Sequence, residues 1–309
     1  GYCIFRNMKI ICCFILAFAT ISCSSKKSNE VALDLNSYKA EINQWHEGRI
    51  ENLKSSNGWL NLAGLFWLKD GVSTFGSDES NDLVFPKDKI PAKAGMFLLN
   101  NGVVSLTALP DVEIFADEKP LKTGMIFHPD STHQPKLSYG SLQWVIIKRD
   151  NQFGVRLRDL ESSKETTFLG IERYEINPGL RMEAVLEVPP VPKRIDITNV
   201  LGQTTAQESP GTLVFTLNEK EYRLDALLEG EELFVIFGDP TNINDTYPSG
   251  RYLYAKKPGA DGKTILDFNK AYNPPCAFTP FATCPLPPLQ NVLSIAITAG
   301  EKNYKGYTH

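Results

Sequence analysis

The sequence has no strong charge of either sign and few of the motifs that carry common chemistry. Its 32 Lys and Arg face 36 Asp and Glu, for a formal net charge of −4, which argues against a nucleic-acid partner because such proteins need a basic face. It contains no Gly-x-Ser-x-Gly elbow, no Walker-type glycine-rich loop and no His-Glu-x-x-His motif. The sequence therefore carries no common catalytic signature, and we predict no cofactor.

Histidine is scarce, with 4 in the chain, and a metal site has little to build on. The segment HPDSTH places His128, Asp130 and His133 close together. Two histidines and one carboxylate only just reach the three or four ligands in defined geometry that a stable site needs. We expect these side chains to be exposed on a proline-containing loop, and we predict no metal site.

The segment before Cys23 has the pattern of an export signal. Met8 and Lys9 give a short positive start, and residues 10–21 form a run without a charge. This run is shorter than the roughly 20 apolar residues that span a bilayer, so it fits the hydrophobic part of a signal peptide, with the small Ser22 before Cys23. A plain secretory signal and a buried N-terminal helix are the alternatives.

This segment also resembles a bacterial lipoprotein signal, in which the cysteine after a small residue is lipidated and becomes the mature N-terminus. Thr20 departs from that pattern, because such signals usually carry Leu or Val there. The resemblance implies a signal segment over residues 1–22, followed by a lipid anchor and tether over residues 23–36. We expect a protein of the bacterial cell envelope, periplasmic or on the outer-membrane face, whose contact with the membrane is the lipid on Cys23.

The body of the chain predicts one helix and then a mainly β fold. Tyr38, Ile42, Trp45 and the stem of Arg49 share one face of an amphipathic helix over residues 37–53. Short runs rich in Val, Ile, Leu and Phe then follow to the C-terminus, separated by Asn, Gly and Pro turns. We predict a β-sandwich after the helix and a second antiparallel β module, sandwich or barrel-like.

The polar, turn-rich segment Arg158–Phe168 is the best candidate boundary. It predicts a first domain over residues 37–160, with the helix and the sandwich, and a second over residues 161–309. Most runs of the second domain are strand-like, and the last of them is VLSIAITAG, residues 292–300.

Part of the first domain resembles the forkhead-associated domain in outline. The likeness rests on GVSTFGSDESNDLVFP, GMFLLNNGVVSLTAL and EIFADEKPLKTG, about 50 residues in all. Ser77 stands where that family has its phosphate-binding Arg, and no Ser-x-x-His follows Pro91. The resemblance supports the β-sandwich, but it does not carry phosphopeptide binding over to this chain.

Only Cys276 and Cys284 lie in the body, since Cys3, Cys12, Cys13 and Cys23 belong to the N-terminal segment. An oxidising compartment permits a disulfide between them. A zinc site would need two further ligands nearby, and a nucleophilic cysteine would need a His or a helix N-terminus. We therefore predict a disulfide, with reduced core thiols as the main alternative and a reactive or metal-bound thiol as the weaker one.

Polar residues next to this proline-rich loop suggest a ligand pocket. The candidate ligand-binding residues are Arg251, Tyr252, Asp267, Asn269, Tyr272 and Asn273. An Arg flanked by carboxylates and tyrosines can line a pocket for an anionic or sugar-like ligand. The alternative is a buried Arg–Asp pair that braces the β core, with Asn side chains capping turns.

The blocks GDPT, YPSGRYLY and LDFNKAYNPPCAFTPFATCPLPP, together with GWLNLAGLFWLKDG, resemble the domain of unknown function 1684 family. The likeness runs from about Trp45 to Lys302. It implies exported or envelope bacterial proteins that are rich in β structure, with no reaction to carry over.

Three functions remain open. The first is an envelope lipoprotein that binds a small polar ligand or another envelope protein. The second is a hydrolase-like enzyme, with Asp239 or Asp267 as general base and Arg251 holding the substrate. The third is a purely structural interaction module.

Overall fold

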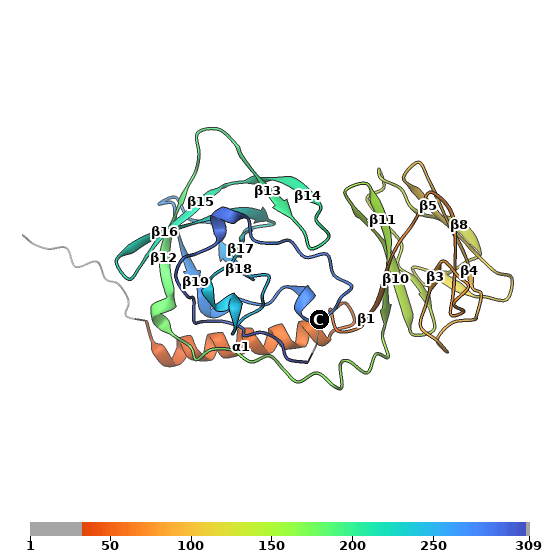
Figure 1. Ribbon diagram of the computed structural model, residues 1–309, viewed down its shortest axis with the longest axis horizontal. Coiled ribbons are helices and arrows are strands. Elements are labelled where there is room, and N and C mark those ends of the chain that lie inside the picture. The colour runs from red at the N-terminus through yellow and green to blue at the C-terminus, as the bar shows by residue number, and fades with distance from the viewer. Residues whose placement is uncertain (1–32, 307–309) are drawn as a thin grey trace, which may run out of the picture. The chain divides into compact units, whose positions relative to one another are not determined.

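The computed structural model describes residues 33–306 (Figure 1). The expected signal segment, the lipidation site Cys23 and the terminal His309 lie outside the described residues. Within that range no helix is long and apolar enough to span a bilayer. The fold is mainly β with one N-terminal helix, as the sequence predicts.

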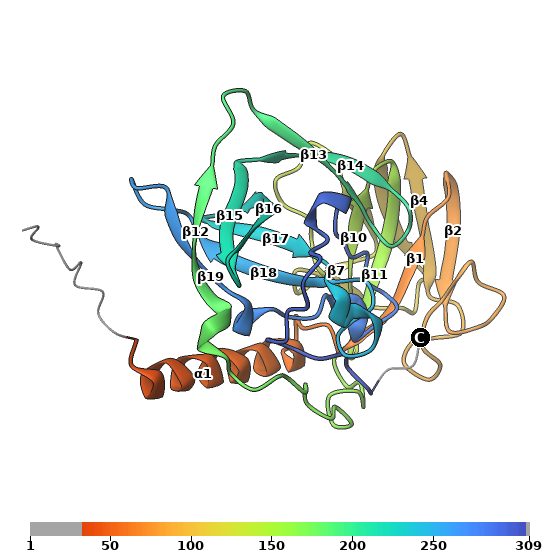
Figure 2. The ribbon, with the colours of Figure 1, turned by 60° about the vertical axis from the view of Figure 1, so that its left-hand side comes forward.

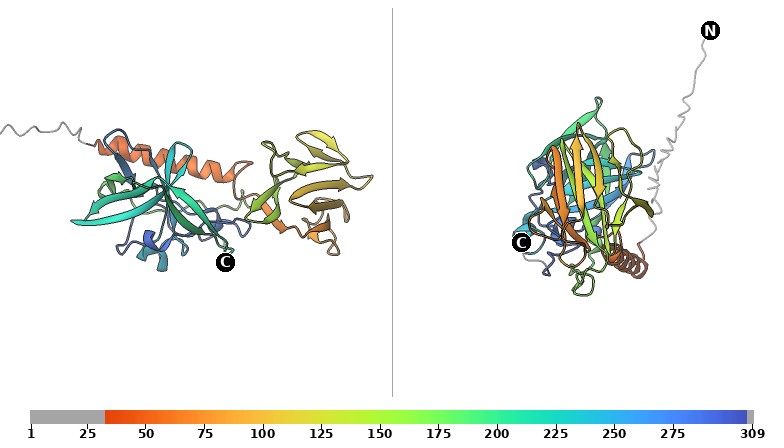
Figure 3. Two further views of the ribbon diagram at one scale, coloured as in Figure 1. Left: turned by 90° about the horizontal axis from the view of Figure 1, so that it is seen from above. Right: turned by 90° about the vertical axis from the view of Figure 1, so that its right-hand side faces the viewer.

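The N-terminal helix α1 covers Leu35–Lys54, two residues longer at its start and one at its end than the prediction. Tyr38, Ile42 and Leu53 are its buried residues, so the helix packs with the face that the sequence indicated. Figures 1 and 2 show α1 running along the barrel described below, and Figure 3 shows the same arrangement from above.

The β-sandwich consists of two sheets around one apolar core. One sheet has the order β1 (Leu62–Trp67), β11 (Gln152–Asp159), β10 (Leu142–Arg149), β9 (Leu137–Tyr139), β6 (Ile114–Ala116) and β7 (Lys119–Leu121). The other has the order β3 (Leu83–Val84), β2 (Gly71–Gly76), β4 (Gly95–Asn100), β5 (Val103–Ala108) and β8 (Thr123–Phe127). Between them the rings of Phe75, Phe85, Phe97 and Trp144 pack with centroids 4.6 to 6.1 Å apart.

The second half is a nearly closed antiparallel barrel. Its order is β18 (Arg251–Lys256), β17 (Glu232–Phe237), β16 (Lys220–Glu229), β15 (Gly211–Leu217), β12 (Arg181–Glu187) and β19 (Lys263–Asp267). At the seam between the two edge strands, the Thr264 hydroxyl donates a hydrogen bond to the Lys256 carbonyl over 2.8 Å. A separate hairpin pairs β13 (Lys193–Thr198) with β14 (Thr204–Ser209).

After β19 the chain continues through short 3₁₀ turns rather than strands. These are η3 (Phe268–Lys270), η4 (Pro275–Ala277) and η5 (Leu289–Asn291). The prediction of a strand over residues 292–300 is wrong, because that run forms no named strand although Ile297 and Ala299 are fully buried in the barrel core. Its strand-like pairing is an isolated bridge between Val292 and Gly238.

Candidate functional site

A cavity lies between α1 and the seam of the barrel. We call it the α1 cavity; it has a volume of about 800 Å³. Its basic lining residues are Arg49, Arg181, Lys256, Lys257, Lys263 and Lys270. Its acidic ones are Glu41, Glu232 and Asp267, and its aromatic ones are Trp45, Tyr254 and Tyr272. The lining thus has six cations against three carboxylates in a protein whose net charge is −4.

Helix α1 supplies one wall because its side chains four residues apart share a face. Glu41, Trp45 and Arg49 all line the cavity from this face. The Arg49 guanidinium donates to Glu301 over 3.1 Å and to the Asn273 carbonyl over 2.8 Å, which fixes it against the barrel. Glu301 is completely buried, and burial raises the pKa of its carboxyl although Arg49 opposes the change.

Tyrosine rings form the second wall. Tyr254 and Tyr272 stack with centroids 6.1 Å apart and planes 10° apart, and the Arg49 guanidinium lies 4.6 Å from the Tyr272 centroid on the ring face. The Trp45 ring lies 6.5 Å from Tyr272. Burial is the main cause that raises the pKa of both tyrosines, so each presents a neutral phenol at physiological pH.

The cations differ in how far they are already neutralised. Lys257, Lys263 and Lys270 form ion pairs with Glu231, Glu183 and Glu41 over 3.0, 2.6 and 2.6 Å. Arg181 and Lys256 form no ion pair within 4 Å among the described residues. Arg181 instead places its guanidinium 5.7 Å from the Tyr38 ring. Arg181 and Lys256 are thus lining cations that no carboxylate holds in a close ion pair.

Asp267 lines this cavity, but the protein itself satisfies its carboxylate. The Tyr38 hydroxyl approaches the two carboxylate oxygens at 2.9 and 3.0 Å, and the backbone N–H and side-chain amide of Asn269 both donate over 3.1 Å. The Asn269 amide also donates to the Asn177 carbonyl over 2.8 Å. Burial and the neighbouring Asp267 charge raise the pKa of Tyr38. Asp267 and Asn269 therefore anchor the start of α1.

The structure places Arg251 and Asp239 elsewhere. They form an ion pair over 2.9 Å with both side chains fully buried. The Arg251 guanidinium also donates to the carbonyls of Ile297 and Ala299, and Asp239 accepts from the Ile297 N–H over 3.2 Å. Desolvation lowers the pKa of Arg251, against the pull of Asp239. Of Asp239, Arg251 and Asp267, only Asp267 lines the α1 cavity.

The remaining predicted pocket residues also divide. Tyr272 lines the α1 cavity. Tyr252 is buried and donates its hydroxyl to the Pro285 carbonyl over 2.8 Å. Asn273 is fully buried, with its N–H donating to Glu301 over 2.7 Å and its amide to the Lys302 carbonyl over 2.7 Å. Its role as a ligand-binding residue stays a prediction.

The structure joins Cys276 and Cys284 as a disulfide, with Cα atoms 6.1 Å apart. Both residues are buried in a small cluster with Leu53, Phe278 and Tyr304. The exposed His133 contacts Asp117 over 2.6 Å rather than His128. Across the described range no three His, Cys, Asp or Glu residues gather as a metal site would require.

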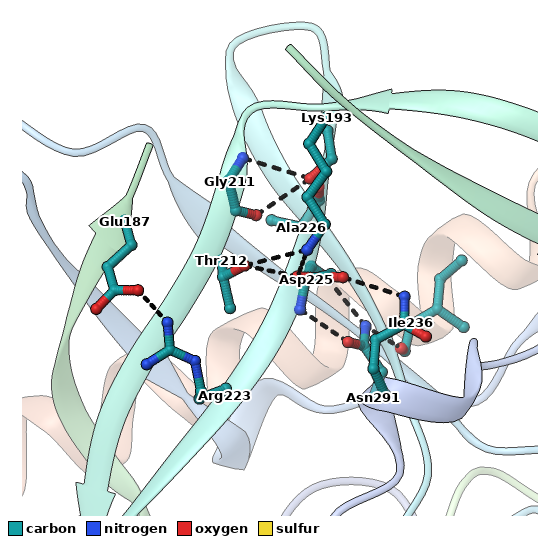
Figure 4. A network of polar contacts seen from close by, with 11 residues as sticks. Glu187, Lys193, Gly211, Thr212, Arg223, Asp225, Ala226, Ile236 and Asn291 are labelled. Carbon is teal, nitrogen blue, oxygen red and sulfur yellow. Dashed lines mark hydrogen bonds and ion pairs between the residues drawn. The ribbon is translucent and has the colours of Figure 1, made fainter. Parts of the chain in front are cut away.

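A second polar cluster, which the sequence did not reveal, centres on the buried Asp225 of β16 (Figure 4). The Lys193 ammonium and the Thr212 hydroxyl each donate to its carboxylate over 2.6 Å. The Asn291 amide donates to the carbonyls of Asp225 and Ile236 over 2.9 Å each. This network ties the β13–β14 hairpin and η5 to the barrel, so it is architecture rather than a binding site.

Sequence reasoning found Asp267 and Tyr272 but missed Glu41, Arg181 and Lys256. The missed residues lie far apart in the sequence, and only the barrel brings them together. The spacing of Glu41, Trp45 and Arg49 on one helix face was the available signal.

Comparison with known proteins gives a family and several similar solved structures. Residues 166–302 match the family described as "Protein of unknown function (DUF1684)". The resemblance expected from the sequence began at about Trp45, and the match does not include Trp45–Glu165. No curated protein matches the chain. An uncharacterized protein of Haloarcula marismortui, solved by NMR, is 33% identical and aligns over 45% of this chain and 80% of its own, with a TM-score of 0.38.

Two forkhead-associated domain structures also match weakly. One is the FhaA domain in complex with the intracellular domain of another protein, and the other comes from a study of phosphothreonine-dependent interactions. Each is 10% identical over 30% of this chain, with a TM-score of 0.22, and covers 97% or 92% of its own length. These scores leave the forkhead-associated resemblance a weak one, from which we take no argument about function.

Proposed function

This chain belongs, through residues 166–302, to the DUF1684 family, and we propose that it binds a small ligand carrying an oxyanion, such as a carboxylate or a phosphate, in the α1 cavity. The observation that carries the proposal is a pair of cations without a close ion-pair partner, Arg181 and Lys256, on the wall of an approximately 800 Å³ cavity. Cavities of this size accommodate a small molecule, and a few convergent charges fix its orientation.

The walls suit such a ligand in two further ways. Arg181 can hold a carboxylate or phosphate through two parallel N–H donors, and Lys256 adds a point charge. The rings of Trp45 and Tyr254 offer apolar surface beside them for the rest of the ligand. The anionic or sugar-like ligand expected from the sequence fits this cavity better than it fits the buried Arg251.

Calorimetric titration of the purified protein with phosphate, phosphorylated sugars, nucleotides and dicarboxylates tests the proposal. We expect at least one of these anions to saturate a single site. The double variant Arg181→Ala, Lys256→Ala should weaken that binding at least about tenfold, since one hydrogen bond to a charged group contributes roughly 1.5–3 kcal/mol.

The matched control is Lys87→Ala, which removes an exposed lysine outside the cavity. It should leave the affinity unchanged at the same ionic strength. Failure of every anion to bind, or equal binding by the double variant and the control, would contradict the proposal.

We also propose the envelope as the place of action, with lipid on Cys23 as the anchor. The support is the charge-free run that ends at Ser22-Cys23. Metabolic labelling with a fatty acid tests it: label should enter the wild-type protein and be lost in Cys23→Ser. Unlabelled wild-type protein that remains soluble after export would contradict it.

The enzyme alternative has one residue to rest on. Asp267 lines the cavity and is the remaining candidate base there, but it already accepts hydrogen bonds from Tyr38 and Asn269. We therefore place binding ahead of catalysis.

A further inference from the structure

Glu41 lines the α1 cavity and forms an ion pair with one of its cations. Its carboxylate projects from α1 and accepts a hydrogen bond from the Lys270 ammonium over 2.6 Å. Arg181 and Lys256 line the same cavity, from β12 and β18. The hydrogen bond from Lys270 is the main cause that lowers the pKa of the Glu41 carboxyl, and the charges of Lys270, Arg181 and Lys256 lower it further. One cation thus pairs with Glu41, and two more line the same cavity.

The fold of α1 does not depend on this contact. Tyr38 anchors the start of the helix through Asp267 and Asn269, and Arg49 anchors its second half through Glu301. The Glu41 side chain is 58% exposed and that of Lys270 is 28% exposed, so their ion pair is solvated and weak. An ion pair of this kind can open without releasing the helix.

We propose that Glu41 is an internal competitor of the ligand, a carboxylate that the ligand's oxyanion displaces from Lys270 when it binds. This inference rests on the proposed function, because it concerns the same cavity. It adds Lys270 to the residues that hold the anion and gives Glu41 the role of setting the affinity. An anion arriving beside Glu41 also meets its like charge, which lowers affinity further until the side chain turns away.

The sign of the effect of Glu41→Gln tests the inference. If Glu41 competes, this variant should bind the anion about two- to fivefold more tightly, the factor that corresponds to losing one exposed ion pair. If Glu41 instead positions Lys270 for the ligand, the variant should bind more weakly. The probe is inorganic sulfate, which keeps its charge across the working pH range, titrated by calorimetry into the full chain.

Two further variants make the result specific. Glu47→Gln removes an exposed carboxylate of the same helix that does not line the cavity, so it should leave sulfate affinity unchanged. Lys270→Ala should weaken sulfate binding. In the Lys270→Ala background, Glu41→Gln should raise the sulfate affinity by a smaller factor than it does in the wild type. Helical circular dichroism and the thermal midpoint confirm that each variant keeps α1 in place.

The outcomes separate this inference from the proposed function. If neither the wild type nor Glu41→Gln binds sulfate or any anion of the panel, the proposed function itself fails. If the wild type binds and Glu41→Gln binds equally or more weakly, the cavity remains an anion site and the competitor role is overturned.

Discussion

The sandwich of β1–β11 has an aromatic and aliphatic interior, whereas the barrel of β12–β19 buries charged and amide side chains. Of the 17 buried polar or charged residues among those described, 13 follow residue 160. The sandwich core is built on rings such as Phe75, Phe97 and Trp144. The barrel contains instead a fully buried Arg251–Asp239 pair and the buried carboxylates of Asp267 and Glu301.

The difference follows from what fills each interior. Two sheets face each other in the sandwich, and their backbone groups pair within the sheets. In the barrel, the chain after β19 pairs with its neighbours through short bridges, such as Tyr252–Tyr272 and Gly238–Val292, rather than through a continuous strand. Some of its buried N–H and C=O groups therefore have side chains as partners. Arg251 donates hydrogen bonds to the carbonyls of Ile297 and Ala299, and Glu301 accepts one from the N–H of Asn273. Buried polar side chains thus supplement the short backbone pairing of this segment.

Arg251→Ala gives the largest expected effect. It leaves the Asp239 carboxylate buried without its cation and removes the donors to two carbonyls, which should cost about 3–5 kcal/mol of unfolding free energy. Urea denaturation monitored by circular dichroism measures it. Arg223→Ala is the control, since the ion pairs of Arg223 with Glu187 and Glu221 are exposed and should contribute at most about 1 kcal/mol.

A double variant keeps the test informative if Arg251→Ala does not fold. Arg251→Met with Asp239→Asn removes both charges together, so it should be more stable than Arg251→Ala alone. In the sandwich, Phe75→Ala should cost a similar amount, about 3–5 kcal/mol, by leaving a cavity. Arg251→Ala with the stability of the wild type would show that the polar interior of the barrel is incidental.

The disulfide comes next and lies wholly in the barrel half. Cys276 and Cys284 are 8 residues apart, and closing so short a loop should stabilise the fold by about 2–3 kcal/mol in the chain-entropy picture. The double variant Cys276→Ala, Cys284→Ala should lose that amount in urea denaturation, and a reductant should then have no further effect on it. Two free thiols detected by alkylation and intact mass after export would contradict the predicted oxidised state.

Tyr38→Phe tests the polar anchor of α1 at a smaller scale. It removes the hydroxyl that meets Asp267 and accepts from Asn269, while keeping the ring in the core. We expect a loss of about 1–2 kcal/mol, because a buried carboxylate then lacks one donor. Tyr222→Phe is the matched control on a half-buried ring of β16. Equal stability of Tyr38→Phe and the wild type would show that the Tyr38 hydroxyl does not stabilise the docking of α1.

The sequence predicted the regular strands better than the irregular, buried segment after β19. Alternating residues predicted β structure, and β13 (Lys193–Thr198) confirms the clearest case. The turn at Asn101-Gly102 adopts φ of 50° and 77°, the geometry expected of that hairpin. The strand predicted over residues 292–300 was wrong, because an apolar run predicts a strand whether or not a neighbouring strand is there to extend the pairing. The cavity could not be predicted from the sequence, because Glu41, Arg181 and Lys256 come from α1, β12 and β18 and only the folded chain places them around one cavity.

The smallest expected effect concerns how the stability contributions of two carboxylates depend on pH. One is Glu41 of α1, and the other is Glu301, which contacts Arg49 of α1. Burial raises the pKa of Glu301 above its ordinary value of 4.5, so the stability it contributes is fully present below pH 4.5 and is lost as pH rises through its folded value. The hydrogen bond from Lys270 lowers the pKa of Glu41, so its contribution is present above pH 4.5 and is lost as pH falls through its folded value.

Unfolding free energies of the wild type, Glu301→Gln and Glu41→Gln, measured by urea denaturation between about pH 3 and pH 7, separate the two. The difference between the wild type and Glu301→Gln should shrink as pH rises, and that between the wild type and Glu41→Gln should shrink as pH falls. Two differences that change with pH in the same direction would mean that both carboxylates are in equivalent surroundings. The contrast between a buried structural carboxylate and an exposed one facing the cavity would then be lost.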